Sequence, residues 1–192
     1  MEIRKIGDQT IFLKGKKENI LINPSKELLN TNKYQSRVII FTDESFDELG
    51  LDNEKVIIRG PGEYEVGGVE VLGINGGGGE PVYVVNMDGI TVCVMGDLKE
   101  ALTDKKVDRV NAGDVLITSI KKNDKVGGKL LLEWAKKWGV NYLLPMGYDN
   151  EKEDLTKFLD ITDQESLEPI ESLKIEKDNL PDGMEVVLLK NI

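Results

Sequence analysis

The strongest constraint on the fold is a pair of apolar, β-branched segments around a two-residue turn. Residues 82–87 and 90–95 read VYVVNM and ITVCVM, and Asp88-Gly89 lies between them. Asp-Gly favours a type I′ turn, because both central residues of that turn take positive φ and its twist matches that of a two-stranded ribbon. The sequence therefore predicts an antiparallel hairpin over residues 82–95.

Further short apolar segments on both sides of this hairpin predict a layered α/β protein. Strands are expected at residues 3–6, 11–13, 20–22, 38–41 and 56–58, and a second hairpin at 64–66 and 69–72. In the later part of the chain, strands expected at 115–117, 140–144 and 184–189 alternate with helices expected at 105–110, 130–138 and around 155–159. This order fits a sandwich with two β-rich halves in the middle and helices outside. No boundary separates two self-sufficient cores, so one domain is expected over residues 1–192.

The charge balance argues against two classes of partner. The chain carries 25 Lys and Arg residues against 35 Asp and Glu residues, a formal net charge of −10. That field repels nucleic-acid phosphates and anionic membranes, and the basic stretches at 14–17 and 121–122 are too short to override it. No N-terminal segment has the length of a signal peptide or a membrane span, so a cytoplasmic protein is expected. The partners that remain are a small molecule, another protein, or a second copy of this chain.

The chain contains no histidine, which restricts the chemistry more than any other count. Histidine is the commonest metal ligand and the commonest general base in proteins. The single cysteine, Cys93, lies inside an apolar segment, so we expect a buried, inert thiol rather than a nucleophile.

An acidic cluster follows the apolar segment at residues 38–41. Residues 39–50 read IIFTDESFDELG, with four carboxylates between Asp43 and Glu48. One interpretation is a helix start, in which Thr42 or Asp43 is the N-cap and the acids favour the first turn. The other is a cation site, and the residues alone leave both open.

Five stretches of this chain occur together and in order in one known family. They are MEI with the later Gly7-Asp8, ILINP at 20–24, GPGEYEVGGV at 60–69, MGDL at 95–98 and LPMGY at 144–148, and GPGEYEVGGV is the most specific. Together they resemble the metallo-β-lactamase superfamily, in the branch similar to L-ascorbate-6-phosphate lactonase and related Zn-dependent hydrolases. The resemblance implies an αββα sandwich with a metal site on the edge between its two sheets.

The resemblance also implies which positions of this chain correspond to the family's metal ligands. The family motif His-x-His-x-Asp-His matches positions Asp43, Ser45, Asp47 and Glu48 of this chain. Only Asp47 is the same residue type as in the family motif. The bridging aspartate of the Gly-Asp-Leu motif is retained as Asp97.

The remaining histidine positions of the family hold no imidazole here. The early Gly-His reads Gly7-Asp8, and the last histidine is replaced by Gly147. The histidine that follows the second hairpin falls in 74–79, INGGGG, whose glycines favour a flexible loop over an anion-binding nest. Zinc hydrolases use neutral imidazoles with carboxylates, and glycine supplies no ligand.

Two functions follow from this comparison. The first is a degenerate, non-catalytic member of the family with no cofactor and a binding or assembly role, including a homo-oligomeric scaffold. The second is a hydrolase of a phosphorylated or lactone-type small molecule that holds Mg²⁺ or Mn²⁺ on Asp43, Asp47, Glu48 and Asp97. Oxygen ligands suit such hard cations and disfavour zinc. Without a cation, carboxylates gathered in one pocket would repel one another.

Overall fold

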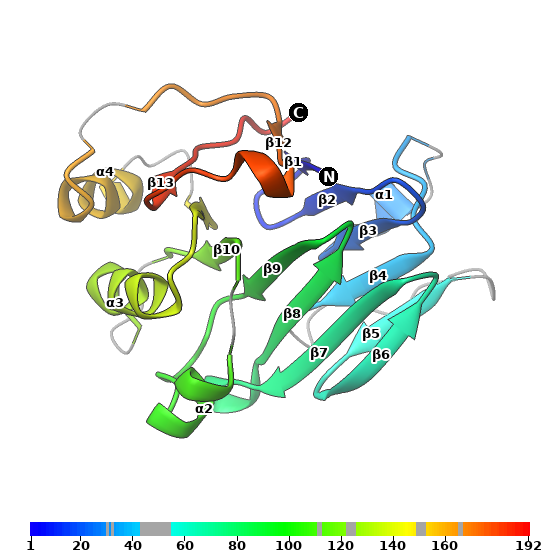
Figure 1. Ribbon diagram of the computed structural model, residues 1–192, viewed down its shortest axis with the longest axis horizontal. Helices are drawn as coiled ribbons and strands as arrows, with labels where there is room; N and C mark the ends of the chain where they lie inside the picture. The colour runs from blue at the N-terminus through cyan, green and yellow to red at the C-terminus, as the bar shows by residue number, and fades with distance from the viewer. Residues whose placement is uncertain are drawn as a thin grey trace.

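Two β-sheets pack face to face, and helices cover the outer side of the second sheet (Figure 1). The computed structural model describes residues 1–29, 31, 33–42, 55–110, 113–121, 126–148, 153–164 and 167–192. This α/β layered sandwich is the fold class that the sequence predicts.

The first sheet contains six strands in the order β12-β1-β2-β3-β4-β5. Their bounds are Leu173–Lys174 for β12, Glu2–Lys5 for β1, Ile11–Lys14 for β2, Asn19–Ile22 for β3, Val38–Phe41 for β4 and Val56–Arg59 for β5. The strands β12, β1, β2 and β3 pair antiparallel, whereas β3, β4 and β5 run parallel. The C-terminal ends of β3, β4 and β5 therefore lie on the same edge of this sheet.

The second sheet contains seven strands in the order β13-β11-β10-β9-β8-β7-β6. Their bounds are Glu185–Val186 for β13, Tyr142–Met146 for β11, Val115–Ser119 for β10, Ile90–Met95 for β9, Pro81–Met87 for β8, Val69–Asn75 for β7 and Gly62–Val66 for β6. Both predicted hairpins are confirmed: β6 pairs with β7 and β8 with β9. Asp88 and Gly89 have φ of 55° and 80°, as a type I′ turn requires. The strands β9, β10 and β11 run parallel and end together.

Four α-helices and two short 3₁₀ helices lie in the described part of the chain. Their bounds are Lys26–Leu29 for α1, Asp104–Arg109 for α2, Gly128–Trp138 for α3, Glu153–Ile161 for α4, Gly77–Gly79 for η1 and Lys177–Asn179 for η2. The three helices predicted from the sequence correspond to α2, α3 and α4. Gly139 ends α3 with φ of 64°, whereas the side chain of Thr103 makes no capping bond at the start of α2. No helix among these residues is long and apolar enough to cross a membrane.

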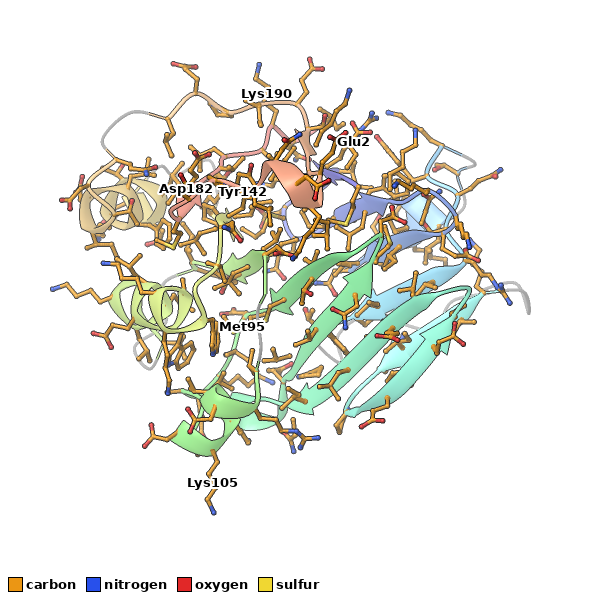
Figure 2. The ribbon with its side chains drawn as sticks, viewed as in Figure 1. Glu2, Met95, Lys105, Tyr142, Asp182 and Lys190 are labelled. Carbon is orange, nitrogen blue, oxygen red and sulfur yellow. The ribbon has the colours of Figure 1, made fainter. Side chains whose placement is uncertain are left out.

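The apolar residues form two main layers, one on each side of the second sheet. The first layer fills the space between the sheets and includes Ile3, Ile40 and Tyr83. The second lies between the second sheet and its helices and includes Cys93 and Trp134. Met95 marks the end of β9 in Figure 2, and Lys105 on α2 points away from the sandwich. Cys93 is completely buried, as predicted, and burial raises the pKa of its thiol.

A buried carboxylate attaches the C-terminal region to the second sheet. Asp114, with a side chain only 7% exposed, accepts a hydrogen bond from the backbone N–H of Thr91 at 2.8 Å. Its other oxygen accepts from Lys177 Nζ at 2.6 Å, which joins η2 to the start of β10. The two termini also meet, because the backbone N–H of Ile192 donates to the carbonyl of Lys5 at 3.2 Å.

Candidate functional site

Polar residues follow directly after the parallel strands of the first sheet. Asn23 follows β3 and Thr42 follows β4, and both are buried. Asn23 Nδ2 donates to Thr42 Oγ1 at 2.8 Å, and Thr42 N donates to Asn23 Oδ1 at 2.9 Å. Asn23 has φ of 49°, a value that asparagine tolerates better than most residues, and Thr10 Oγ1 donates to its carbonyl at 2.7 Å. These bonds fix the point at which the chain leaves β4.

The second sheet meets this edge at Gly96, directly after β9. A Cβ on Gly96 would lie 2.5 Å from Thr42 Oγ1, so only glycine lets the two sheets approach so closely here. Asp97 follows and is half-buried. Its carboxylate has no hydrogen bond or ion pair with any residue that the structure describes. The predicted site residue Asp97 therefore lies on the expected edge between the sheets.

A small, mostly apolar cavity of about 20 Å³ lies between the sheets at this edge. Its lining includes Gln9, Asn23, Thr42, Gly96, Ser119 and Met146. This volume accommodates about one water molecule, so the cavity is too small for a substrate. A larger cavity of about 340 Å³ lies elsewhere, between α3 and α4, and none of these residues lines it.

Tyr83 on β8 connects the two sheets near the end of β4. Its side chain is completely buried, its hydroxyl accepts from the backbone N–H of Gly60 at 2.7 Å, and it donates to the carbonyl of Phe41 at 3.0 Å. Burial raises the pKa of the phenol to about 12, while the hydrogen bond from Gly60 opposes the shift. The phenol therefore stays a neutral donor and positions the strand that leads into residues 43–48. Sequence reasoning missed this role, because a tyrosine in a continuous apolar strand looks like ordinary core.

Lys5 is a second residue at this edge that sequence reasoning missed. Only 4% of it is exposed, and its Nζ lies 4.1 Å from the centroid of the Tyr148 ring. Burial lowers the pKa of Lys5 and the nearby Asp8 carboxylate opposes this, whereas burial and Asp8 both raise the pKa of Tyr148. Strand alternation could have revealed Lys5, because it shares a strand face with the core residue Ile3.

Glycines stand at Gly147 and in the segment 74–79, the two places that the resemblance matches to histidines of the family. Gly147 has φ of 68°, and a Cβ on it would lie 2.8 Å from Ser119 Oγ. In the glycine-rich segment, a Cβ on Gly77 would lie 1.6 Å from the carbonyl oxygen of Glu100. The segment contains the short helix η1, which lies against the chain that follows Asp97.

Comparison with known proteins identifies the family. The family model of the beta-lactamase superfamily domain matches residues 2–147, which include the strand edge described above and Asp97. The chain belongs to the metallo-β-lactamase superfamily. None of the curated proteins matches this superfamily member significantly in sequence.

Several solved structures share this sandwich over nearly the whole chain. A candidate Zn-dependent hydrolase of the metallo-β-lactamase superfamily from Thermotoga maritima is 25% identical, with a TM-score of 0.81 and 98% of both chains covered. A candidate metal-dependent hydrolase from Parabacteroides distasonis is 13% identical, with a TM-score of 0.66, covering 98% of this chain and 93% of that one. An isothiocyanate hydrolase from Delia radicum gut bacteria is 14% identical, with a TM-score of 0.63, covering 91% of this chain and 99% of that one. The last two similarities concern the fold alone.

The described residues of this metallo-β-lactamase-fold protein do not fit a zinc centre. Zinc is held by imidazole, thiolate and carboxylate ligands in a tetrahedral arrangement. Across the described ranges, no three cysteine, aspartate or glutamate side chains come together, and Gly147 supplies no side-chain ligand. The other predicted site residues, Asp43, Asp47 and Glu48, lie outside the described residues, and so does Ser45.

Proposed function

We propose that this protein is a non-catalytic member of the metallo-β-lactamase superfamily that binds a small molecule or a protein partner, including a second copy of itself. The observation that carries the proposal is the absence of histidine from all 192 residues. A zinc hydrolase of this fold needs neutral imidazoles to hold the metal while a bound water is activated near neutral pH. The backbone at Gly147 agrees, because its φ of 68° is one that residues with side chains rarely adopt.

Within the superfamily, we place the chain in the branch that resembles L-ascorbate-6-phosphate lactonase. The motif GPGEYEVGGV forms the hairpin of β6 and β7, and MGDL places Asp97 at the end of β9. The similarity to the candidate Zn-dependent hydrolase from Thermotoga maritima extends over nearly the whole of both chains. The scaffold of such a hydrolase is kept, whereas its metal-binding histidines are lost.

One observation favours a second function, a hydrolase that uses Mg²⁺ or Mn²⁺. The carboxylate of Asp97 has no partner within the part of the chain that the structure describes, and the resemblance matches it to the family's bridging aspartate. Together with Asp43, Asp47 and Glu48 it would supply the oxygen ligands that hard cations prefer.

Metal analysis of the purified protein separates these functions. The protein must be prepared without a histidine tag, because a tag would add imidazoles to a chain that has none. We expect less than stoichiometric zinc by mass spectrometry, and no shift of the melting temperature with Zn²⁺, Mg²⁺ or Mn²⁺ in the wild type or in Asp97→Asn.

Two results would contradict the proposal in different ways. Zinc bound at one equivalent per chain would show that the superfamily's metal centre persists without histidine. A rise in melting temperature with Mg²⁺ or Mn²⁺ that Asp97→Asn abolishes and Asp108→Asn, an exposed control, retains would establish the hard-cation site instead.

A further inference from the structure

A cavity of about 340 Å³ opens between α3 and α4, on the outer side of the second sheet (Figure 1). Its lining comes from three segments: residues 120–121 after β10, residues 126–129 around the start of α3, and the face of α4 that carries Phe158. Its volume falls at the lower end of the range for small-molecule sites, whereas the cavity between the sheets holds about one water molecule. The cavity between the helices therefore has room for a small ligand.

The buried part of this lining is apolar. Ile120, Val126 and Phe158 are buried members of the layer between the second sheet and its helices, and Ile161 packs against the same layer. Gly128 lets the two helices approach closely, because a Cβ there would lie 2.7 Å from Ile161 Cδ1 and 3.1 Å from Phe158 Cδ2. Side chains anchored in a packed layer hold their positions, so the apolar surface is formed before any ligand arrives.

The charged part of the lining is mainly basic. Lys121, Lys129 and Lys157 come one from each of the three segments, and Asp154 supplies one negative charge. Lys157 is paired with Glu153, whereas Lys121 and Lys129 form no ion pair with any residue in the described ranges. The three ammonium groups against two carboxylates leave one net positive charge, in a chain whose formal net charge is −10. The cavity thus combines a local positive excess with a buried apolar surface.

We propose that this cavity binds a small carboxylate with an apolar body, and that Lys121 and Lys129 hold its charged group. The buried lining removes the apolar part of such a ligand from water, which supplies most of the binding free energy. A carboxylate accepts hydrogen bonds from two ammonium groups, and its single charge neutralises the local excess. A doubly charged phosphate ester would leave a negative excess beside Asp154. This inference rests on the proposed binding function and names its ligand class.

Calorimetry with hexanoate tests this proposal, because hexanoate combines a carboxylate with an apolar chain. Acetate keeps the charge and lacks most of the chain, whereas hexanamide keeps the chain and lacks the charge. We expect the wild type to bind hexanoate at least about tenfold more tightly than either. In two-dimensional ¹H–¹⁵N spectra, the largest shifts on addition of hexanoate should fall on residues 126–129.

Two double variants with the same change in net charge locate the carboxylate contact. Lys121→Gln with Lys129→Gln removes both proposed partners, whereas Lys105→Gln with Lys136→Gln removes two exposed lysines outside the cavity. All four lysines are exposed, so both variants should melt within about 2 °C of the wild type. We expect the first variant to bind hexanoate about tenfold more weakly and the control variant to bind it as the wild type does.

Each alternative result overturns the inference. If acetate or hexanamide binds as tightly as hexanoate, either the apolar surface or the charge plays no part in recognition. If the two double variants bind hexanoate equally, or the largest spectral shifts fall on another segment, the site is elsewhere. If hexanoate does not bind, the inference is wrong, and a dimer in light scattering would then point to a second copy as the occupant. Stoichiometric zinc would refute the proposed non-catalytic function without producing any of these results.

Discussion

Removal of the Tyr83 hydroxyl tests whether this phenol holds the two sheets together at the site edge. Tyr83→Phe keeps the ring, which is completely buried, and deletes one oxygen that bonds Gly60 N at 2.7 Å and Phe41 O at 3.0 Å. A buried polar group that loses its hydrogen-bond partner costs about 1–3 kcal/mol. In Tyr83→Phe, both the N–H of Gly60 and the carbonyl of Phe41 lose this partner. Because Gly60 is only half-buried, water can compensate part of its loss. We therefore expect a loss of about 3 kcal/mol in the free energy of unfolding.

Thermal and urea unfolding, followed by circular dichroism, measure this effect. For a chain of this length, about 3 kcal/mol corresponds to a melting temperature lower by roughly 6–12 °C. The matched control is Tyr142→Phe, since the hydroxyl of Tyr142 has no hydrogen bond with a described residue, and it should change stability by less than about 0.5 kcal/mol. Equal effects of the two substitutions would refute the assignment of a bridging role to Tyr83.

Alkaline titration gives an independent measure of the same phenol. The folded-state pKa of Tyr83 is raised to about 12, above the usual value of about 10, mainly by burial. Folding therefore favours the neutral phenol, and its contribution to stability is fully present below about pH 10 and is lost as pH rises towards about 12. The stability difference between wild type and Tyr83→Phe should shrink over this range, and a constant difference would contradict the raised pKa.

Three further predictions concern the site edge and the C-terminal region. Gly147→His should lower the free energy of unfolding by about 1–3 kcal/mol, because φ of 68° strains any side chain, whereas Gly183→His, in open space, should have little effect by the same melting assay. Asp97→Asn should leave stability unchanged or raise it by up to about 2 kcal/mol, and a drop seen in metal-containing buffer but not with chelator would contradict this. Asp114→Asn should cost about 1–2 kcal/mol through its lost ionic hydrogen bond, against less than about 0.5 kcal/mol for Asp108→Asn at an exposed ion pair.

Local sequence patterns predicted most of the secondary structure because they act over a few neighbouring residues. Asp88-Gly89 specified its turn through the φ values that it tolerates, and Gly139 ended α3 for the same reason. The two-residue strand β12 was not predicted, and β13 is shorter than the strand expected at 184–189. Each is held by pairing with a strand far away in the chain, β1 or β11, and two residues carry no periodicity of their own.

The candidate site was predictable in part. The position of Asp97 at the end of β9 followed from the family resemblance, and the structure places it on the expected edge. The prediction for Asp43, Asp47 and Glu48 stays a prediction, since these residues lie outside the described ranges. The packing of Gly77 against Glu100 could not be foreseen, because it joins two segments that are separated by two strands.

The sequence by itself determined the alternation of strands and helices, the two hairpins and the absence of imidazole ligands. Only the tertiary structure decided which strand ends meet. The contact of Gly96 with Thr42, the bridge made by Tyr83 and the placement of Lys5 on Tyr148 all join residues from different sheets. Such contacts depend on how two twisted sheets pack against each other, and hydrophobic burial, which drives that packing, is not directional. Local propensity therefore determines the secondary-structure elements, whereas the close packing of the two sheets determines which residues meet at the site.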